Sequence, residues 1–474
     1  MSFWNVDNLK AAMGGTWVAR CAVESVIGLS TDSRTLKAGQ AFLAIKGETF
    51  DGHAKVHEAA AAGAPLVVVD ALGAVGGKLP DGVGVLKVGD TRRALLRLAA
   101  AYRKTLERTR VVAVCGSNGK TTTVRMLSAV LARGGESENR WRGTASPRSF
   151  NNEIGVPLTI LSAMPGDQYL ICEIGTNAPG EVATLAEVVQ PDIALITSIG
   201  REHLERLGSV RGVAREEATV LEHVRPGGAG GAGIVTADSA ELREVLPSLG
   251  SRPRAMITFG FDDSADVRVV EVRQSLGGVR FTLNDKAEFA MPILGRHNAA
   301  NAAGVVAAAR RLGMGDAEIA AGLAAVKGEA MRLEVVKAGG VCIINDAYNA
   351  NPDSMRASLE TFFEVAAEAK RRFVVLGDML EMGSYSDEGH REVVESLRDR
   401  PVHGAVLVGK AMRGAAGALA GTNIEVTLVD DLDEKRAGEV AGKLRAGDAV
   451  LLKGSRRMRL ERLLPAMKAP VAMH

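Results

Sequence analysis

The sequence predicts an α/β protein built on parallel sheets, because short β-branched runs alternate with Ala- and Leu-rich stretches along the chain. The apolar runs typical of buried parallel strands are residues 65–70, 111–115, 169–175, 193–200, 341–346, 372–378, 404–409 and 448–454. Between them, residues 91–107 and 298–313 have the apolar spacing of helices. This alternation indicates right-handed β–α–β crossovers.

Composition indicates a globular protein of several domains, since 474 residues exceed one ordinary core. A net charge of +2 gives no reason to expect a nucleic-acid or membrane-surface partner. The chain has no long uncharged apolar run and no basic leader, so we expect neither membrane insertion nor secretion. Four scattered cysteines favour a reduced, cytoplasmic location.

The same patterns suggest where the domains begin and end. One boundary is expected after residue 107, where a predicted helix ends, and a second near residue 328, after Ala-rich helices. The predicted domains are therefore residues 1–107, 108–328 and 329–474. We interpret the glycine-rich stretch 226–233 as a loop, because a strand-like segment follows it directly.

Residues 111–123, VVAVCGSNGKTTT, resemble a phosphate-binding loop between a strand and a helix. Gly116 and Gly119 allow a tight turn whose backbone N–H groups face an anion, and the following helix points its positive end there. Lys120 can reach the β/γ-phosphates, and the Thr121 hydroxyl can ligate Mg²⁺. The usual first glycine would fall at Val114, so an ordinary strand–turn–helix remains an alternative.

Several other motifs have both a functional and a structural interpretation. Ser33 and Arg34 can fork onto a phosphate or lie in a solvated loop. The adjacent Asn151 and Asn152 suit sugar or peptide recognition, or an Asx turn that caps a helix. Glu173 ends an apolar strand and is a candidate Mg²⁺ ligand, or a cap for the next helix.

Three further motifs also have both a functional and a structural interpretation. His203 follows a strand end and is either a metal ligand or an ordinary surface or core histidine. Asn298 and Asn301 share a helical face that could contact a nucleobase or line a helix–helix seam. Arg332 precedes the strand end at Asp346 and could neutralise a transferring phosphoryl group.

Taken in order, these motifs resemble those of the Mur ligase family from Asp32 to about Ser455. The segments that carry the resemblance are GSNGKTTT, FNNEIGVPLTIL, EIGTNAPGE, HLERLGS, GRHNAANA, NDAYNANPDSM, LGDMLEMG and LLKGS. The resemblance implies an N-terminal UDP-substrate domain, a central P-loop parallel-sheet ATPase domain and a C-terminal Rossmann-like domain. It implies ATP- and Mg²⁺-dependent amide-bond formation through an acyl phosphate, in peptidoglycan precursor synthesis. The DSR and DGH motifs, the NNEIGVP block and the DAYNANPDSM turn separate the chain from the ligases that act earlier in that pathway. The resemblance therefore implies UDP-N-acetylmuramoyl-tripeptide and D-alanyl-D-alanine as the two substrates.

The resemblance also assigns roles to individual residues. The expected catalytic residues are Lys120, Glu173, His203 and Arg332. The expected ATP contacts are Gly116, Ser117, Asn118, Gly119, Lys120, Thr121, Thr122, Asn298, Asn301, Arg332 and Asp346. The expected substrate contacts are Ser33 and Arg34 toward UDP, Asn349 and Asn351 toward the dipeptide, and Asn151 and Asn152. The expected Mg²⁺ ligands are Thr121, Glu173, His203 and Glu217.

The chain departs from the family pattern at two positions. Where the family carries a carbamylated lysine, this chain has Glu217, and where it carries an asparagine, this chain has Ser198. A glutamate keeps the negative charge without CO₂, but its carboxyl carbon lies three atoms from Cα and not six. We hypothesise that Glu217 replaces the carbamate; the alternative is a solvated glutamate and an altered second metal site.

These departures leave other functions open. The alternatives are a sister Mur ligase, an amide ligase like folylpolyglutamate synthase, and a nucleotide-binding homologue that has lost catalysis. We expect a monomer. The third peptide residue, diaminopimelate or lysine, is not predicted.

Overall fold

The computed structural model describes residues 3–47, 50–135, 140–226 and 231–468. Contacts divide the chain into two compact units. The first contains Met1–Ala113, Arg142–Gly175 and Ala183–Pro191, and the second contains Val114–Trp141, Thr176–Val182 and Asp192–His474. The α/β fold class is confirmed, whereas the two domain boundaries, at residues 107 and 328, remain predictions. Among the described residues, no helix has the length and apolar character needed to cross a bilayer.

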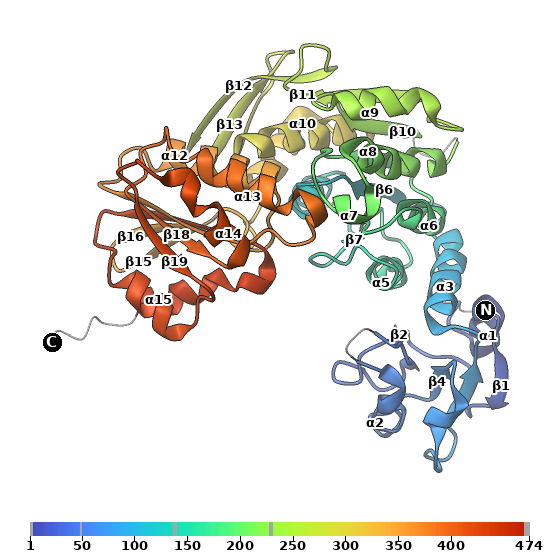
Figure 1. Cartoon of the computed structure of the whole chain (residues 1–474). Coiled ribbons are helices and arrows are strands. Elements are labelled where there is room, and N and C mark those ends of the chain that lie inside the picture. Colours follow the sequence, from blue (N-terminus) through green and yellow to red (C-terminus); the bar gives the residue numbers. More distant parts are fainter. Residues whose placement is uncertain (1–2, 48–49, 136–139, 227–230, 469–474) are drawn as a thin grey trace. The chain divides into compact units, whose positions relative to one another are not determined.

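The N-terminal part of the first unit is a small sheet with strand order β1-β5-β4-β3-β2, labelled in part in Figure 1. β1 runs antiparallel to β5, and the pairs β5–β4, β4–β3 and β3–β2 are parallel. The strands are β1 Thr16–Ala19, β2 Leu29–Ser30, β3 Ala41–Leu43, β4 Leu66–Val69 and β5 Gly84–Lys87. The helices are α1 Val6–Met13, η1 Gly52–Lys55, α2 Val56–Ala61, η2 Leu72–Val75 and α3 Thr91–Thr105.

Strand β4 shows why this sheet forms, because its four apolar side chains alternate between two cores. Leu66 and Val68 pack in a cluster with residues of α1 and α3. Val67 and Val69 pack in a second cluster with residues of α2. A strand buried on both faces reads as a continuous apolar run, which is why β4 was predicted. Strands β1, β2 and β5 were not predicted.

The rest of the first unit contains a strand pair and a helix. β7 Gly143–Ala145 pairs in parallel with β8 Tyr169–Glu173, and α5 Gly155–Ser162 lies between them in sequence. Two elements, β6 Arg110–Cys115 and α6 Glu181–Val189, continue along the chain from one unit into the other. The Asn152 side chain accepts from the N–H groups of Ile154 and Gly155, so it caps the start of α5.

The second unit begins with helices and strands that follow the phosphate-loop motif. Its strands run in the order β14-β13-β12-β11-β10-β9, parallel from β9 to β12 and antiparallel from β12 to β14. They are β9 Ile193–Ile196, β10 Ala232–Thr236, β11 Ala255–Gly260, β12 Val267–Ser275, β13 Gly278–Leu283 and β14 Glu288–Met291. The helices are α4 Lys120–Leu131, α7 Leu204–Leu207, α8 Val210–Ala218, η3 Thr219–His223, α9 Ala240–Val245, η4 Leu246–Ser248, α10 Arg296–Arg311 and α11 Asp316–Ala324.

The antiparallel strands β12 to β14 were not predicted. Much of β12 is exposed and mixes charged with apolar residues, so it lacks the continuous apolar run of a buried parallel strand. Of the expected loop at 226–233, residues 227–230 lie outside the described residues, and Ala232 already begins β10.

The C-terminal part of the second unit is a sheet with strand order β15-β16-β20-β17-β18-β19, in which β15 is antiparallel to β16 and the other neighbours are parallel (Figure 1). The strands are β15 Glu334–Ala338, β16 Val341–Asp346, β17 Arg372–Gly377, β18 Gly404–Val408, β19 Glu425–Val429 and β20 Ala449–Lys453. The helices are α12 Pro352–Val365, η5 Gly383–Tyr385, α13 Ser386–Glu395, α14 Lys410–Ala415, η6 Ala416–Leu419, α15 Glu434–Ala441, η7 Arg456–Met458, η8 Leu460–Arg462 and α16 Leu463–Lys468.

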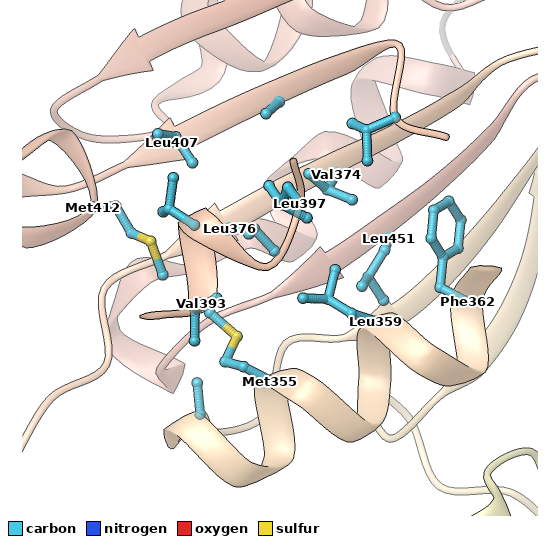
Figure 2. Packing of buried hydrophobic residues seen from close by; sticks show 14 of the residues in the cluster. Met355, Leu359, Phe362, Val374, Leu376, Val393, Leu397, Leu407, Met412 and Leu451 are labelled. Atoms are coloured by element: carbon cyan, nitrogen blue, oxygen red, sulfur yellow. The ribbon is translucent and has the colours of Figure 1, made fainter. Parts of the chain in front are cut away.

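Helix α12 packs on one face of this sheet. Figure 2 shows Met355, Leu359 and Phe362 of α12 turned toward Val374 and Leu451 of the strands. The alternate strand residues, such as Val375, pack in a separate cluster with residues of α15 and α16. The strands predicted at 341–346, 372–378, 404–409 and 448–454 are therefore confirmed, and their carboxyl ends place Asp346 and Lys453 side by side in register.

Candidate nucleotide and phosphate site

The turn between β6 and α4 has the glycine conformations that a phosphate-binding loop requires. Gly116 has φ of 114° and Gly119 has φ of 86°, values that L side chains rarely adopt. A Cβ atom on Gly116 would lie 2.5 Å from Thr197 Oγ1, and one on Gly119 would lie 2.4 Å from Asn301 Nδ2. Both positions therefore need glycine, which accounts for their presence in the motif.

Helix α4 begins at Lys120 and presents its amino terminus to this turn. Its N-cap is Gly119, which has no side chain to accept from the N–H groups of the first turn. Those groups and the helix dipole fit an anion such as a phosphate. Lys120 Nζ donates to the carbonyls of Gly116 at 2.5 Å and Ser117 at 3.2 Å, so it lies folded onto the loop.

Ser198, one of the two departures from the family pattern, forms hydrogen bonds with the backbone of the turn between β6 and α4. The N–H of Ser117 donates to the Ser198 carbonyl at 2.8 Å, and the N–H of Asn118 donates to Ser198 Oγ at 2.9 Å. Thr197 Oγ1 donates to the Asn118 carbonyl at 2.6 Å. A short hydroxyl at position 198 can thus fix the loop backbone directly.

Glu217, the second departure, lies at the end of α8 with its carboxylate turned to the loop. It is fully buried, and Oε2 accepts from the N–H of Gly116 at 2.8 Å. The Cys115 thiol lies 3.8 Å from the Glu217 carbonyl, so the backbone of α8 comes close to the end of β6. Burial raises the pKa of Glu217, and the nearby Lys120 charge opposes that rise. A solvated glutamate is excluded by this burial.

A second buried carboxylate, Glu202, was not among the predicted residues. Its Oε1 lies 3.9 Å from Lys120 Nζ, and its side chain is 12% exposed. Burial raises the pKa of Glu202 to about 8, against the lowering effect of Lys120. The sequence feature that could have identified Glu202 is its position directly before His203, in the loop that follows β9.

His203 has a left-handed backbone conformation, φ 49°, at the start of α7. Its Nδ1 lies 3.0 Å from Glu381 Oε2, and its Nε2 lies 3.9 Å from Glu202 Oε2. Burial lowers the pKa of His203, although Glu381 opposes this. A neutral imidazole is the form that binds metals.

The residues of the second unit fit a cation bound beside phosphate. Within the described ranges, no group of three or more His, Cys, Asp and Glu side chains is arranged to hold a metal alone. However, Glu217 Oε1 and Glu202 Oε1 are buried carboxylate oxygens without a hydrogen-bond partner among the described residues. Mg²⁺ commonly takes one or two protein ligands and completes its shell with phosphate oxygens and water. Glu217 Oε1 suits such a ligand, and the roles of Thr121 and His203 in holding Mg²⁺ remain predictions.

Arg332 reaches the start of α4 from the segment that precedes β15. Its Nη2 donates to Thr121 Oγ1 at 3.1 Å, and its guanidinium lies over the Tyr348 ring at 4.2 Å. Asp346, at the end of β16, accepts from the N–H of Leu333 at 3.1 Å. The structure therefore brings Arg332 to the phosphate loop, while Asp346 supports the segment that carries it.

Asn298 and Asn301 are buried on one face of α10, as their spacing predicts. Asn298 Nδ2 donates to the Leu294 carbonyl at 2.6 Å, and Asn301 Nδ2 donates to Asn298 Oδ1 at 3.3 Å. Asn301 also lies beneath Gly119. These contacts match the helix-seam interpretation, and the adenine contact remains a prediction.

Of the two predicted dipeptide contacts, Asn351 lies next to the loop. It caps α12 by accepting from the N–H of Ser354, and its Nδ2 donates to Asn118 Oδ1 at 3.0 Å. Asn349 is exposed. Arg201 was not predicted, yet it pairs with Asp353 at 3.0 Å and with Glu392 at 2.7 Å.

In the first unit, the predicted substrate residues lie in two places. Ser33 Oγ donates to Glu58 at 2.7 Å, and Arg34 pairs with Asp32 at 2.7 Å. Arg34 holds the pKa of Asp32 down at about 2. This loop is exposed enough to meet a ligand and also matches the solvated alternative.

The second place is the end of β8, where Glu173 is buried. Asn151 Nδ2 donates to Glu173 Oε1 at 2.9 Å, and the Asn151 carbonyl accepts from Gly175 at 2.8 Å. Asn152 instead caps α5, which is the structural interpretation of that residue. The two adjacent asparagines thus have different roles.

Comparison with known proteins assigns a family to this arrangement. Models described as the Mur ligase family catalytic domain, the Mur ligase middle domain and the Mur ligase glutamate ligase domain match residues 25–103, 114–309 and 331–456. The chain is similar to the UDP-N-acetylmuramoyl-tripeptide–D-alanyl-D-alanine ligase of Bacillus subtilis, with 35% identity over 97% of each chain. A crystal structure of MurF from Acinetobacter baumannii has a TM-score of 0.85 at 29% identity over 98% of each chain. The MurF ligase of Thermotoga maritima, solved in complex with ADP, has a TM-score of 0.77 at 26% identity, covering 93% of this chain and 97% of that one.

Proposed function

The chain belongs to the Mur ligase family, and from that premise we propose that it joins D-alanyl-D-alanine to UDP-N-acetylmuramoyl-tripeptide in an ATP-dependent reaction. The observation that carries the proposal is the contact of Arg332 with Thr121, the residue after the loop lysine. The side chains of Lys120 and Arg332, two cations from distant parts of the sequence, thus lie at the same loop, which is suited to phosphate. Such convergence fits the transfer of a phosphoryl group, whose charge must be offset in the transition state.

The proposed reaction has two steps. A carboxylate resists attack by an amine because its oxygen is a poor leaving group, so the tripeptide carboxylate first bonds to the γ-phosphorus of ATP and ADP leaves. The dipeptide amine then bonds to the carbonyl carbon of the acyl phosphate, the C–O bond breaks and phosphate leaves. The amine proton passes to solvent or a nearby base. Lys120 and Arg332 would offset negative charge in the first step.

Mg²⁺ would supply further positive charge beside the phosphates. Thr121, His203 and Glu217 are the residues of the second unit proposed to hold it, and Glu173 remains a ligand predicted from the sequence. Glu217 Oε1 is buried and has no hydrogen-bond partner in the described part of the chain, which supports this assignment, because a buried carboxylate is costly unless it is paired. Glu217 would then supply its charge without CO₂.

The experiment is product formation from UDP-N-acetylmuramoyl-tripeptide, D-alanyl-D-alanine and Mg-ATP, followed by phosphate release and mass spectrometry. Separate reactions contain lysine- and diaminopimelate-containing tripeptides, single amino acids, and a folate with glutamate. Lys120→Ala is the negative control. Turnover only with a single amino acid or with folate would identify a sister ligase or a folylpolyglutamate synthase-like enzyme. No substrate-dependent ATP hydrolysis would indicate a non-catalytic homologue.

We also propose a monomer in the cytoplasm, on sequence grounds. Sedimentation velocity and cell fractionation test these two statements. A concentration-independent sedimentation coefficient that corresponds to 49.7 kDa would support the first.

A further inference from the structure

The backbone on either side of Arg332 has an unusual conformation. Met331 has φ of 62° and Leu333 has φ of 50°, although neither is glycine. Large side chains rarely adopt positive φ, and such residues persist only where the surrounding structure holds them. Contacts with the surrounding structure must therefore hold the backbone of residues 331–333, from which the Arg332 side chain extends.

The restraint at Leu333 is a buried carboxylate. The N–H of Leu333 donates to Asp346 Oδ1 at 3.1 Å, and Leu333 is only 6% exposed. On the other side of Arg332, the N–H of Met331 donates to Glu334 Oε2 at 3.0 Å, and the Met331 carbonyl accepts from Tyr348 at 3.2 Å. The Tyr348 ring then lies against the guanidinium. The hydrogen bond from Leu333 to Asp346 is thus one of the contacts that hold the Arg332 side chain close to Thr121.

Asp346 is in turn held by two residues that have no other assigned role. Lys453 Nζ lies 2.7 Å from Asp346 Oδ2, and Ser358 Oγ donates to the same oxygen. Lys453 is 4% exposed, and a buried lysine is costly unless it is paired. Its strand β20 lies next to β16 with Lys453 opposite Asp346 in register. Both oxygens of Asp346 are therefore engaged within the protein, and its charge is neutralised.

We propose that Lys453 and Ser358 are positioning residues that hold Arg332 at the nucleotide site through Asp346 and the N–H of Leu333. The proposal rests on the proposed function, since it takes Arg332 to contact the nucleotide. Lys453 fixes one oxygen of the Asp346 carboxylate, which leaves the other aimed at Leu333. The Lys453 ammonium itself need not touch ATP.

The test is a double-mutant cycle on the binding of a non-hydrolysable ATP analogue, measured by calorimetry on the full chain. We expect Lys453→Met to weaken binding about tenfold in the wild-type background, and to change it less than twofold when Arg332 is already Ala. Ser358→Ala, a milder change, should show the same non-additivity with a smaller effect. Thermal melts establish that each variant is folded.

The matched control is Thr361→Val, one turn further along α12. Thr361 is buried, but its hydroxyl donates within the helix to the Ala357 carbonyl at 2.8 Å. This variant should bind the analogue as the wild type does. An equal loss from Lys453→Met with and without Arg332 would overturn the proposal, as would unchanged binding in both Lys453→Met and Ser358→Ala.

Failure of this inference can be distinguished from failure of the proposed function. If Arg332→Ala binds the analogue normally, Arg332 does not contribute to nucleotide binding. Lys453 and Ser358 then cannot act through it, and the inference is wrong whatever product the enzyme makes. The ligase reaction described above, run on the wild type, judges the function independently of the cycle.

Discussion

The carboxylate of Glu217 accepts a hydrogen bond from the N–H of Gly116, with 2.8 Å between Oε2 and N. The two residues are 101 positions apart in sequence. A glutamate side chain is therefore long enough to reach the phosphate loop from α8, even though it is shorter than a carbamylated lysine. The second oxygen, Oε1, remains without a hydrogen-bond partner among the described residues and suits a cation.

Glu217→Gln should lower turnover by at least about a hundredfold while the protein stays folded. The amide oxygen can still accept from Gly116, but a neutral amide does not attract Mg²⁺. Steady-state assays, with and without bicarbonate, measure the effect, and wild-type turnover should not depend on bicarbonate. Glu216→Gln is the control, because the Glu216 oxygens accept from Gly180 and Val182 instead. Full activity of Glu217→Gln would show that the hypothesis is wrong.

Gly119→Ala should abolish the rise in melting temperature that Mg-ATP produces. The new Cβ would meet Asn301 Nδ2 at 2.4 Å in a left-handed backbone, so the loop or the buried Asn301 amide beneath it must shift. Gly313→Ala is the control that measures only the free-energy cost of placing alanine at positive φ, since Gly313 has φ of 88° with open space around it. That variant should lose about 1 kcal/mol of stability and keep the ATP response. Loss of the response in both variants would contradict this explanation.

Glu202→Gln should stabilise the nucleotide-free protein at high pH. Burial raises the folded-state pKa of Glu202 to about 8, above its ordinary value of about 4.5. Below pH 4.5 the carboxyl is protonated whether the chain is folded or unfolded, so its contribution to stability is complete there. That contribution is lost as the pH rises toward 8, because the folded state then holds a proton that the unfolded state has released.

Melting temperatures between pH 5 and 9 measure this effect. The difference between Glu202→Gln and wild type should grow from pH 5 to pH 8 and then level off. Glu395→Gln, which removes an exposed carboxylate, is the control for the loss of one negative charge. A flat difference for Glu202→Gln would show that Glu202 is ionised at neutral pH in the folded protein.

Phe362→Ala should destabilise the C-terminal sheet by about 3–5 kcal/mol, the usual cost of a large cavity. Phe362 is fully buried between α12 and the strands, as Figure 2 shows. Its neighbour Phe363 is only partly buried, so Phe363→Ala should cost less. Urea denaturation of the two variants measures the difference. Equal losses would mean that burial of the ring does not determine the cost.

Much of the fold could be predicted from local patterns. Strands β4, β16, β17, β18 and β20 are buried on both faces, so each appears in the sequence as a continuous apolar run. The antiparallel strands β12 to β14 lack that run, because their buried residues are interspersed with more exposed ones, and they were missed. The positions of Gly116 and Gly119 were also predictable, because a tight turn against a helix start leaves a characteristic local spacing.

The sequence by itself determined the α/β class, the phosphate loop and the order of the family motifs, since each depends on residues close together in the chain. Only the tertiary structure decided which distant groups meet. It placed Glu217 on Gly116, Glu202 beside Lys120 and Arg332 on Thr121. Those contacts depend on the packing of elements that are up to 211 residues apart, and a local pattern carries no information about such packing.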